Sequence, residues 1–118
     1  MNQVEDFNDY RKRMNEKILG VDNLVIKRMF NLDTMSYQEG SLDARTKELL
    51  GLTSSLVLRC DDCVKYHLGK CFEMNFTKNE IFEAMSVGLL VGGTIVIPHL
   101  RKAAEYWEEL EKNVSERS

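Results

Sequence analysis

The chain has 118 residues, of which 43% are hydrophobic and 30% are charged, and its net charge is -3. This composition is typical of a soluble, helix-rich protein, and the length suffices for one domain with a modest core. The 16 basic and 19 acidic residues are spread without a basic block, which excludes nucleic acid and anionic membranes as main partners. We therefore expect one all-α domain over residues 1–118.

The first two helices are indicated by helical periodicity. Apolar residues recur every three or four positions over residues 7–21, which predicts an amphipathic helix that Gly20 ends or interrupts. A second, short helix is predicted around residues 24–32. The polar residues 33–40 show no sustained apolar period and are predicted to form a connector.

Two helices are predicted in the middle of the chain. Ser41 or Asp43 can cap the first, which runs to about Leu58. The second contains all three cysteines and keeps helical spacing until Asn75, which can end it in the left-handed conformation.

Two further helices are predicted in the last third. Thr77 and Glu80 form a capping-box pattern, so a helix should begin at Lys78, and Pro98 suits the first turn of the last helix. The last helix carries an apolar seam like the contact line of paired helices: Leu100, Ala103, Trp107, Leu110 and Val114. This seam and the small size of the chain predict a homo-oligomer. The total is about six helices and no sheet.

The cellular compartment is indicated by the N-terminus and the cysteines. The first ten residues carry acidic side chains and no apolar core, so no export signal is predicted. The uncharged run over residues 84–98 is shorter than the roughly 20 apolar residues of a bilayer span, and it contains three glycines. Three cysteines, an odd number, favour thiols that are reduced or used in chemistry over a disulfide framework. We expect a cytoplasmic protein.

Cys60 and Cys63 are the strongest candidates for chemistry. Three residues apart, both can lie in the first turn of one helix, where free backbone amides and the helix dipole favour an anion. The Cys-x-x-Cys arrangement can lower the pKa of a thiol well below about 8.5. The same spacing lets the two sulfurs form a small-loop disulfide, so a nucleophile and its resolving partner are adjacent.

Glu48 and His67 complete a possible catalytic set. His67 follows Cys63 by four residues and lies over the same helix face, where it can take the cysteine proton. Glu48 precedes Cys60 by twelve residues and could orient His67 if its helix folds back. Taken singly, each residue has an ordinary alternative: a buried small thiol, a packed histidine or a solvated glutamate. The combination at these spacings favours nucleophile, base and orienter.

A metal site is the main alternative use of these side chains. Cys60, Cys63, His67 and Cys71 superficially resemble a zinc knuckle. On one continuous helix, however, Cys60 and Cys71 would lie about 16 Å apart, whereas a tetrahedral site needs every ligand within about 2.3 Å of the metal. We expect no metal, and Cys71, on the apolar stripe of this helix, is predicted to be a buried free thiol.

Tyr66 and His99 are pocket candidates of lower rank. Tyr66 is adjacent to His67 and could line a pocket, with packing as the alternative. His99 follows Pro98 at a helix start, where it could act as an acid or contact a substrate, with an ordinary first-turn position as the alternative.

The run over residues 47–67 resembles the signature of the carboxymuconolactone decarboxylase family, in particular its alkylhydroperoxidase D-like branch. The specific part is the Glu-x11-Cys-x2-Cys-x3-His spacing that starts at Glu48. The glycine-rich segment 84–98, which ends in proline before a last helix, is also similar, and the resemblance covers roughly residues 20–110.

The resemblance implies an alkylhydroperoxidase D-like helical fold that assembles into dimers, trimers or hexamers. It implies a thiol peroxidase, an antioxidant activity, or a disulfide reductase activity. In this branch a cysteine pair cycles between dithiol and disulfide, which assigns Cys60 and Cys63 as the redox pair. His67 and Glu48 would then relay protons.

Three functional hypotheses follow. The first is an oxidoreductase that acts on a peroxide or a small-molecule disulfide. No flavin, haem or nicotinamide motif is present, so we expect no cofactor, and an external thiol or dithiol must supply electrons. The second is a lactone-decarboxylating lyase with His67 or His99 as acid or base, which the Cys-x-x-Cys pair disfavours. The third is a non-enzymatic helical oligomer.

Overall fold

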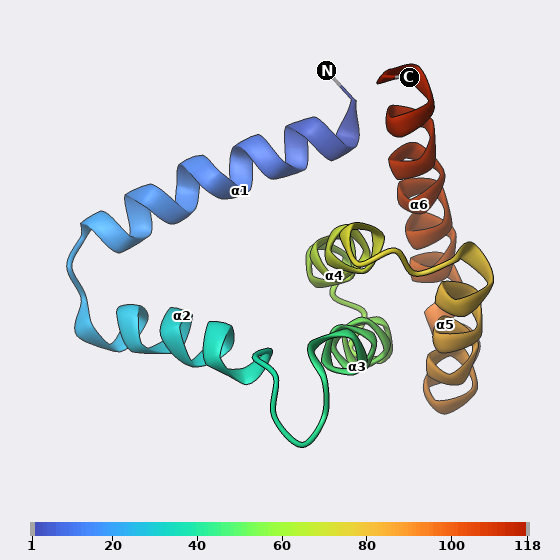
Figure 1. Cartoon of the computed structure of the whole chain (residues 1–118), viewed down its shortest axis with the longest axis horizontal. Coiled ribbons are helices and arrows are strands. Elements are labelled where there is room, and N and C mark those ends of the chain that lie inside the picture. The colour runs from blue at the N-terminus through green and yellow to red at the C-terminus, as the bar shows by residue number, and fades with distance from the viewer. Residues whose placement is uncertain (1, 118) are drawn as a thin grey trace.

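In the computed structural model, which describes residues 2–117, the chain forms six α-helices, one short 3₁₀ turn and no strand (Figure 1). The helices are α1 (Gln3–Gly20), α2 (Leu24–Ser36), α3 (Ala44–Val57), α4 (Asp61–Glu73), α5 (Lys78–Gly92) and α6 (Ile97–Arg117), with the turn η1 (Thr94–Val96) before α6. The predicted all-α class is confirmed. None of these helices is both long and apolar enough to cross a bilayer.

The helix ends follow the local capping signals. The carboxylate of Asp43 accepts a hydrogen bond from the Thr46 backbone N–H at the start of α3. Thr77 and Glu80 form both hydrogen bonds of the predicted capping box at the start of α5. Asn75 has a positive φ of 64° just after α4, as predicted for a left-handed helix end.

The predicted end of the second helix is wrong by about one turn. α2 continues to Ser36, so the connector to α3 begins at Tyr37 rather than at Asp33. The extra residues are mostly polar and face water, so they add nothing to the apolar period. They nevertheless stay helical, and the Thr34 hydroxyl donates a hydrogen bond to the Phe30 carbonyl oxygen one turn earlier.

The core lies among α3, α4, α5 and α6. In Figure 1, α3 and α4 are seen nearly end-on beside one another, with α5 and α6 along one side of them. The largest fully buried side chains are Leu52, Leu56, Leu68, Cys71, Ile81, Met85, Val96, Tyr106 and Trp107. This four-helix core packs around the α3–α4 pair, and Glu48, Cys63 and His67 lie on that pair.

The apolar seam of α6 packs inside the protomer. Ala103, Trp107 and Leu110 are buried, and the Trp107 ring lies edge-on to Phe72 of α4 at a centroid distance of 5.2 Å. The interpretation of this seam as a contact line between two copies is therefore wrong, because α4 and α1 already cover it. Only Val114, near the end of the helix, remains about half exposed.

α2 instead presents an uncovered apolar surface. No residue of α2 is buried, and Figure 1 shows α2 set apart from α3 to α6, whereas the start of α1 lies beside α6. We define the α2 face by its five large apolar side chains, each more than half exposed: Leu24, Val25, Met29, Leu32 and Met35. A contiguous apolar surface of this kind is typical of a protein interaction site.

A tight turn brings α4 back against α3. Arg59 adopts a left-handed φ of 60°, and its backbone N–H donates to the Leu56 carbonyl oxygen. The Cys60 backbone N–H donates to the Ser55 carbonyl oxygen at 3.1 Å. These bonds end α3 in the manner of a left-handed helix cap and start α4 at once. Residues on either side of the turn can therefore face each other across the two helices.

Candidate functional site

The two cysteines of the Cys-x-x-Cys motif are joined by a disulfide at the start of α4. Cys60 is the N-cap residue, Cys63 lies in the first turn, and their Cα atoms are 5.3 Å apart. The Cys63 backbone N–H points at the Cys60 sulfur, with an N–S distance of 3.3 Å. This contact holds the Cys60 side chain at the start of α4, next to Cys63.

Glu48 of α3 and His67 of α4 form a buried pair. Glu48 Oε2 lies 2.8 Å from His67 Nδ1, and only 4% and 7% of the two residues are exposed. A carboxylate with so little water needs a hydrogen-bonding partner, because its burial unpaired is costly. The structure thus brings together the two residues that were expected to relay protons.

Tyr37 is a third member of this group, and sequence reasoning missed it because it lies in the predicted polar connector. Its hydroxyl oxygen lies 3.3 Å from His67 Nε2, and the two ring centroids are 5.2 Å apart. Gly51, in the interior of α3, makes room for the contact: a Cβ there would lie 2.6 Å from both Tyr37 Oη and His67 Cε1. A glycine inside an otherwise regular helix was the available signal, since it commonly marks a close approach.

Cys63 and His67 border one cavity of about 440 Å³. Asp62 and Tyr66 of α4 line the same cavity, so Tyr66 lies where a pocket residue was expected. The opposite wall is largely apolar and comes from α1, through Phe7, Tyr10, Met14 and Ile18. The Tyr66 ring also lies edge-on to the His67 ring at 5.2 Å.

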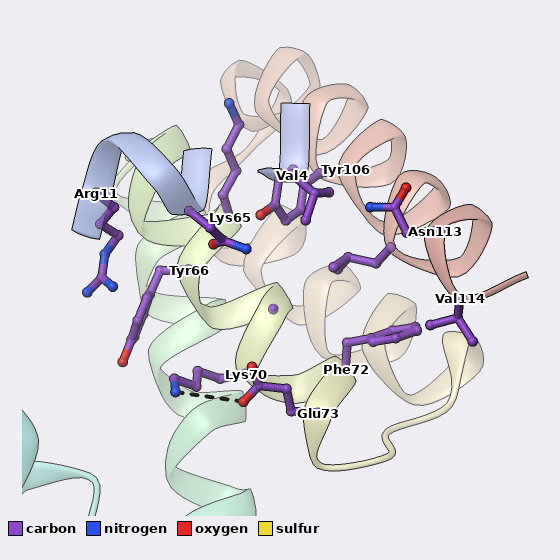
Figure 2. Close-up of a pocket in the computed structure, with 13 residues that line it drawn as sticks. Val4, Arg11, Lys65, Tyr66, Lys70, Phe72, Glu73, Tyr106, Asn113 and Val114 are labelled. Atoms are coloured by element: carbon purple, nitrogen blue, oxygen red, sulfur yellow. Dashed lines mark ion pairs between the residues drawn. The ribbon is translucent and has the colours of Figure 1, made fainter. Parts of the chain in front are cut away.

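A second cavity of about 310 Å³ lies on the other side of Tyr66 (Figure 2). Arg11 and Tyr66 line both cavities, and the Arg11 guanidinium stacks over the Tyr66 ring at 3.9 Å. In Figure 2, Lys70 and Glu73 form an ion pair at its rim, with an N–O distance of 3.7 Å. None of the described residues that line it is a cysteine or histidine, so the candidate residues Cys63 and His67 border the first cavity and not this one.

His99, in the first turn of α6, lies apart from His67 and contacts the N-terminal end of α4. Its Nδ1 is 2.8 Å from Asp61 Oδ1, and Lys102 Nζ is 3.2 Å from Asp61 Oδ2. Burial acts to raise the pKa of Asp61, but these two hydrogen bonds outweigh it and hold the pKa below its usual value. His99 therefore hydrogen-bonds Asp61, the residue that follows Cys60. It is not among the described residues that line the 440 Å³ cavity.

Cys71 is fully buried in the core, as its place on the apolar stripe predicted. Burial, with a smaller effect of the Glu48 carboxylate, raises the pKa of this thiol to about 12. Within the described part of the chain, no three His, Cys, Asp or Glu side chains gather closely enough to hold a metal ion.

The fold and the site together define a small all-α protein in which a Cys60–Cys63 disulfide and a buried glutamate–histidine pair lie on the helices α3 and α4. Residues 24–106 match the carboxymuconolactone decarboxylase family, and the chain belongs to that family.

Solved structures support the assignment. A crystal structure of a Thermotoga maritima protein is 49% identical, covers 95% of this chain and 98% of its own, and has a TM-score of 0.92. A second crystal structure of that protein, with a TM-score of 0.90, describes a carboxymuconolactone decarboxylase family protein with a suggested involvement in antioxidative response. A Legionella pneumophila member of the family shares the fold, with a TM-score of 0.83 at 19% identity over 92% of this chain and 97% of its own.

Two curated relatives carry no described activity. An uncharacterized protein of Cupriavidus necator is 30% identical over 73 residues, which are 62% of this chain and 65% of that protein. An uncharacterized protein of the cox locus of Paracoccus denitrificans is 26% identical over 80 residues, 68% of this chain and 72% of its own. This chain thus spans slightly less than two thirds of the Cupriavidus protein.

Proposed function

We propose that this protein is a thiol-dependent oxidoreductase that reduces a peroxide through the Cys60–Cys63 pair. The observation that carries the proposal is that Cys63 lines one cavity together with His67, which is paired with the buried Glu48. Activation of a thiol requires a nucleophile, a base and a carboxylate that orients the base, and we assign these roles to Cys63, His67 and Glu48. The suggested antioxidative role of the Thermotoga maritima relative is consistent with this chemistry.

Activation begins at the reduced pair. His67 accepts the proton of the Cys63 thiol, and the Glu48 carboxylate stabilises the resulting imidazolium through Nδ1. Cys63 is the attacking residue because its side chain is exposed and borders the cavity together with His67. Cys60, half-buried at the helix N-cap, is the resolving residue.

Each turnover of the proposed cycle reduces one peroxide and oxidises the two cysteines to a disulfide. The Cys63 thiolate attacks one peroxide oxygen, the O–O bond breaks, and the leaving alkoxide takes the proton held by His67 to give an alcohol. The Cys60 thiol then displaces water from the sulfenic acid and closes the disulfide that the structure contains. An external thiol or dithiol returns two electrons and two protons. We place this cycle in the cytoplasm, where such reductants are abundant.

The apolar wall of the cavity also accommodates a small-molecule disulfide, and the same cysteines would reduce it by thiol–disulfide exchange. The two substrates are distinguished by offering each one to the reduced protein and following the loss of thiols.

The direct test is a thiol titration before and after a small excess of tert-butyl hydroperoxide, with the disulfide mapped by mass spectrometry. We expect rapid loss of two thiols, a Cys60–Cys63 linkage and a free Cys71. Thiols in the folded protein that react no faster than those of the unfolded chain would overturn the proposal. Cys71→Ser is the matched control, because it removes a thiol that lies in the core and should leave the rate unchanged.

We further propose that a second copy of this chain covers the α2 face in a homo-oligomer, a trimer or hexamer. Five apolar side chains on one helix without any buried residue make this surface costly to leave in water.

A further inference from the structure

Both ring nitrogens of His67 have a partner. Nδ1 lies 2.8 Å from Glu48 Oε2, and Nε2 lies 3.3 Å from Tyr37 Oη. A carboxylate can only accept hydrogen bonds, so the proton of the neutral imidazole is on Nδ1 and Nε2 carries the lone pair. The Tyr37 hydroxyl therefore donates to Nε2. The three side chains form one directed chain of hydrogen bonds.

The contact between Tyr37 and His67 is built into α3. Gly51 is the backbone that faces both side chains, and any Cβ there would clash with Tyr37 Oη and His67 Cε1 at 2.6 Å. A glycine in a helix interior costs about 1 kcal/mol relative to alanine. Burial, together with the negative charges of Glu48 and Asp33, raises the pKa of Tyr37 and keeps its hydroxyl protonated as a donor.

From this geometry we infer that Tyr37 is a positioning residue of the thiol chemistry, which holds His67 Nε2 as the nitrogen that receives the cysteine proton. The inference rests on the proposed function. Nε2 has a single lone pair, so the Tyr37 O–H first rotates away from it. Nε2 then takes the proton of Cys63, and the His67 cation donates to Glu48 through Nδ1 and to the Tyr37 oxygen through Nε2. A phenol hydroxyl can donate or accept, so Tyr37 stays bonded to the ring in both protonation states.

The titratable and charged groups that surround His67 come from α1, α2, the connector, α3 and α4: Arg11, Asp33, Tyr37, Glu48, Asp62, Cys63 and Tyr66. Among these groups, only Glu48 and Tyr37 place a hydrogen-bonding atom within 3.3 Å of a nitrogen of the His67 ring.

The test compares wild type, Tyr37→Phe and Tyr106→Phe by two measurements. The first is the ¹⁵N chemical shifts of the imidazole nitrogens in histidine-labelled protein; the chain has two histidines, and His99→Gln assigns them. The second is the rate at which tert-butyl hydroperoxide oxidises the reduced pair between about pH 5 and pH 9, a range that brackets the ordinary histidine pKa. Tyr106 is a buried tyrosine of α6 that lines the other cavity, so its variant removes a hydroxyl away from His67.

We expect Tyr37→Phe to move the Nε2 resonance of His67, to shift the pH profile and to slow oxidation about tenfold, which corresponds to about 1.4 kcal/mol. Tyr106→Phe should match wild type in all three. Gly51→Ala, which forces the two side chains apart but keeps the hydroxyl, should reproduce the change in the Nε2 resonance.

Two outcomes would overturn the inference, and they are distinguishable. If wild type oxidises rapidly while Tyr37→Phe keeps the same Nε2 resonance and pH profile, Tyr37 has no positioning role and the proposed function stands. If wild type does not react with the hydroperoxide at all, the proposed function fails and the inference fails with it.

Discussion

Glu48 Oε2 and His67 Nδ1 lie 2.8 Å apart in a site that is almost closed to water, although the residues are far apart in the chain. The α3–α4 turn at Arg59 creates this contact by reversing the chain between them. Because a buried carboxylate is stable only with a partner, the pair is both a structural and a chemical unit.

Replacing Glu48 by glutamine should disable the proton relay. The neutral amide cannot stabilise an imidazolium, so we expect oxidation of Cys63 by a hydroperoxide to slow about 10²-fold, the lower range for general acid–base catalysis. The control is Glu73→Gln on the exposed surface of α4, where the ion pair with Lys70 contributes little. Equal rates for the two variants, measured by stopped-flow, would contradict the relay.

Replacing Gly51 by alanine should destabilise the fold. The new methyl group would overlap His67 and Tyr37, and overpacking of this kind typically costs about 1–3 kcal/mol. Gly69→Ala in α4 is the matched control, because a Cβ there meets nothing within 4 Å. That control should be neutral or stabilising by up to about 1 kcal/mol. Denaturant unfolding of both reduced proteins measures the difference, and a stabilised Gly51→Ala would show that the site is looser than the structure indicates.

Cys71 should be inert in the folded protein. With its pKa raised to about 12, only about one thiol in ten thousand is ionised at pH 8, and the side chain is fully buried. After reduction, iodoacetamide should label Cys60 and Cys63 rapidly and Cys71 only in denaturant. Peptide mapping over time gives the three rates, and Cys71 labelling as fast as that of Cys63 would contradict this prediction.

Asp61 should contribute to stability in a pH-dependent way. Its folded pKa is lowered, so its contribution is present above the unfolded value of about 3.9 and is lost as the pH falls through the folded value. At pH 7, Asp61→Asn should therefore lower the free energy of unfolding by less than about 1 kcal/mol, and the melting temperature with it. This effect should fade as the pH falls below about 3.9.

Asp9→Asn, which removes an exposed carboxylate of α1, is the control for surface charge in these melting curves. A destabilisation by Asp61→Asn that stays equal between pH 7 and the lowest pH at which the protein remains folded would show that the ionised form of Asp61 is not the source of the effect.

The α2 face should control assembly. Wild type is expected to be an oligomer at micromolar concentration by light scattering, and Met29→Glu with Leu32→Glu should shift it toward the monomer. Lys12→Glu, on the exposed side of α1, tests whether added negative charge alone has this effect. A monomeric wild type would contradict the prediction outright.

Local chemistry explains which features were predictable. The Thr77–Glu80 capping box and the left-handed Asn75 depend on neighbours within a few residues, and both were predicted. The cap of α3 was predicted to be Ser41 or Asp43, and it is Asp43. The extension of α2 to Ser36 was not, because its exposed polar residues give no apolar period. The α6 seam was correctly found to be apolar, but periodicity alone cannot say whether its partner is in the same chain.

The sequence by itself determined the all-α class, the family, and the spacing that places Glu48, the two cysteines and His67 on two successive helices. These follow from periods and turns of a few residues. Only the tertiary structure decided that Tyr37 reaches His67, that Gly51 makes room for it, and that His99 braces Asp61 instead of lining the cavity. Those contacts join residues far apart along the chain, and their distances depend on how whole helices pack.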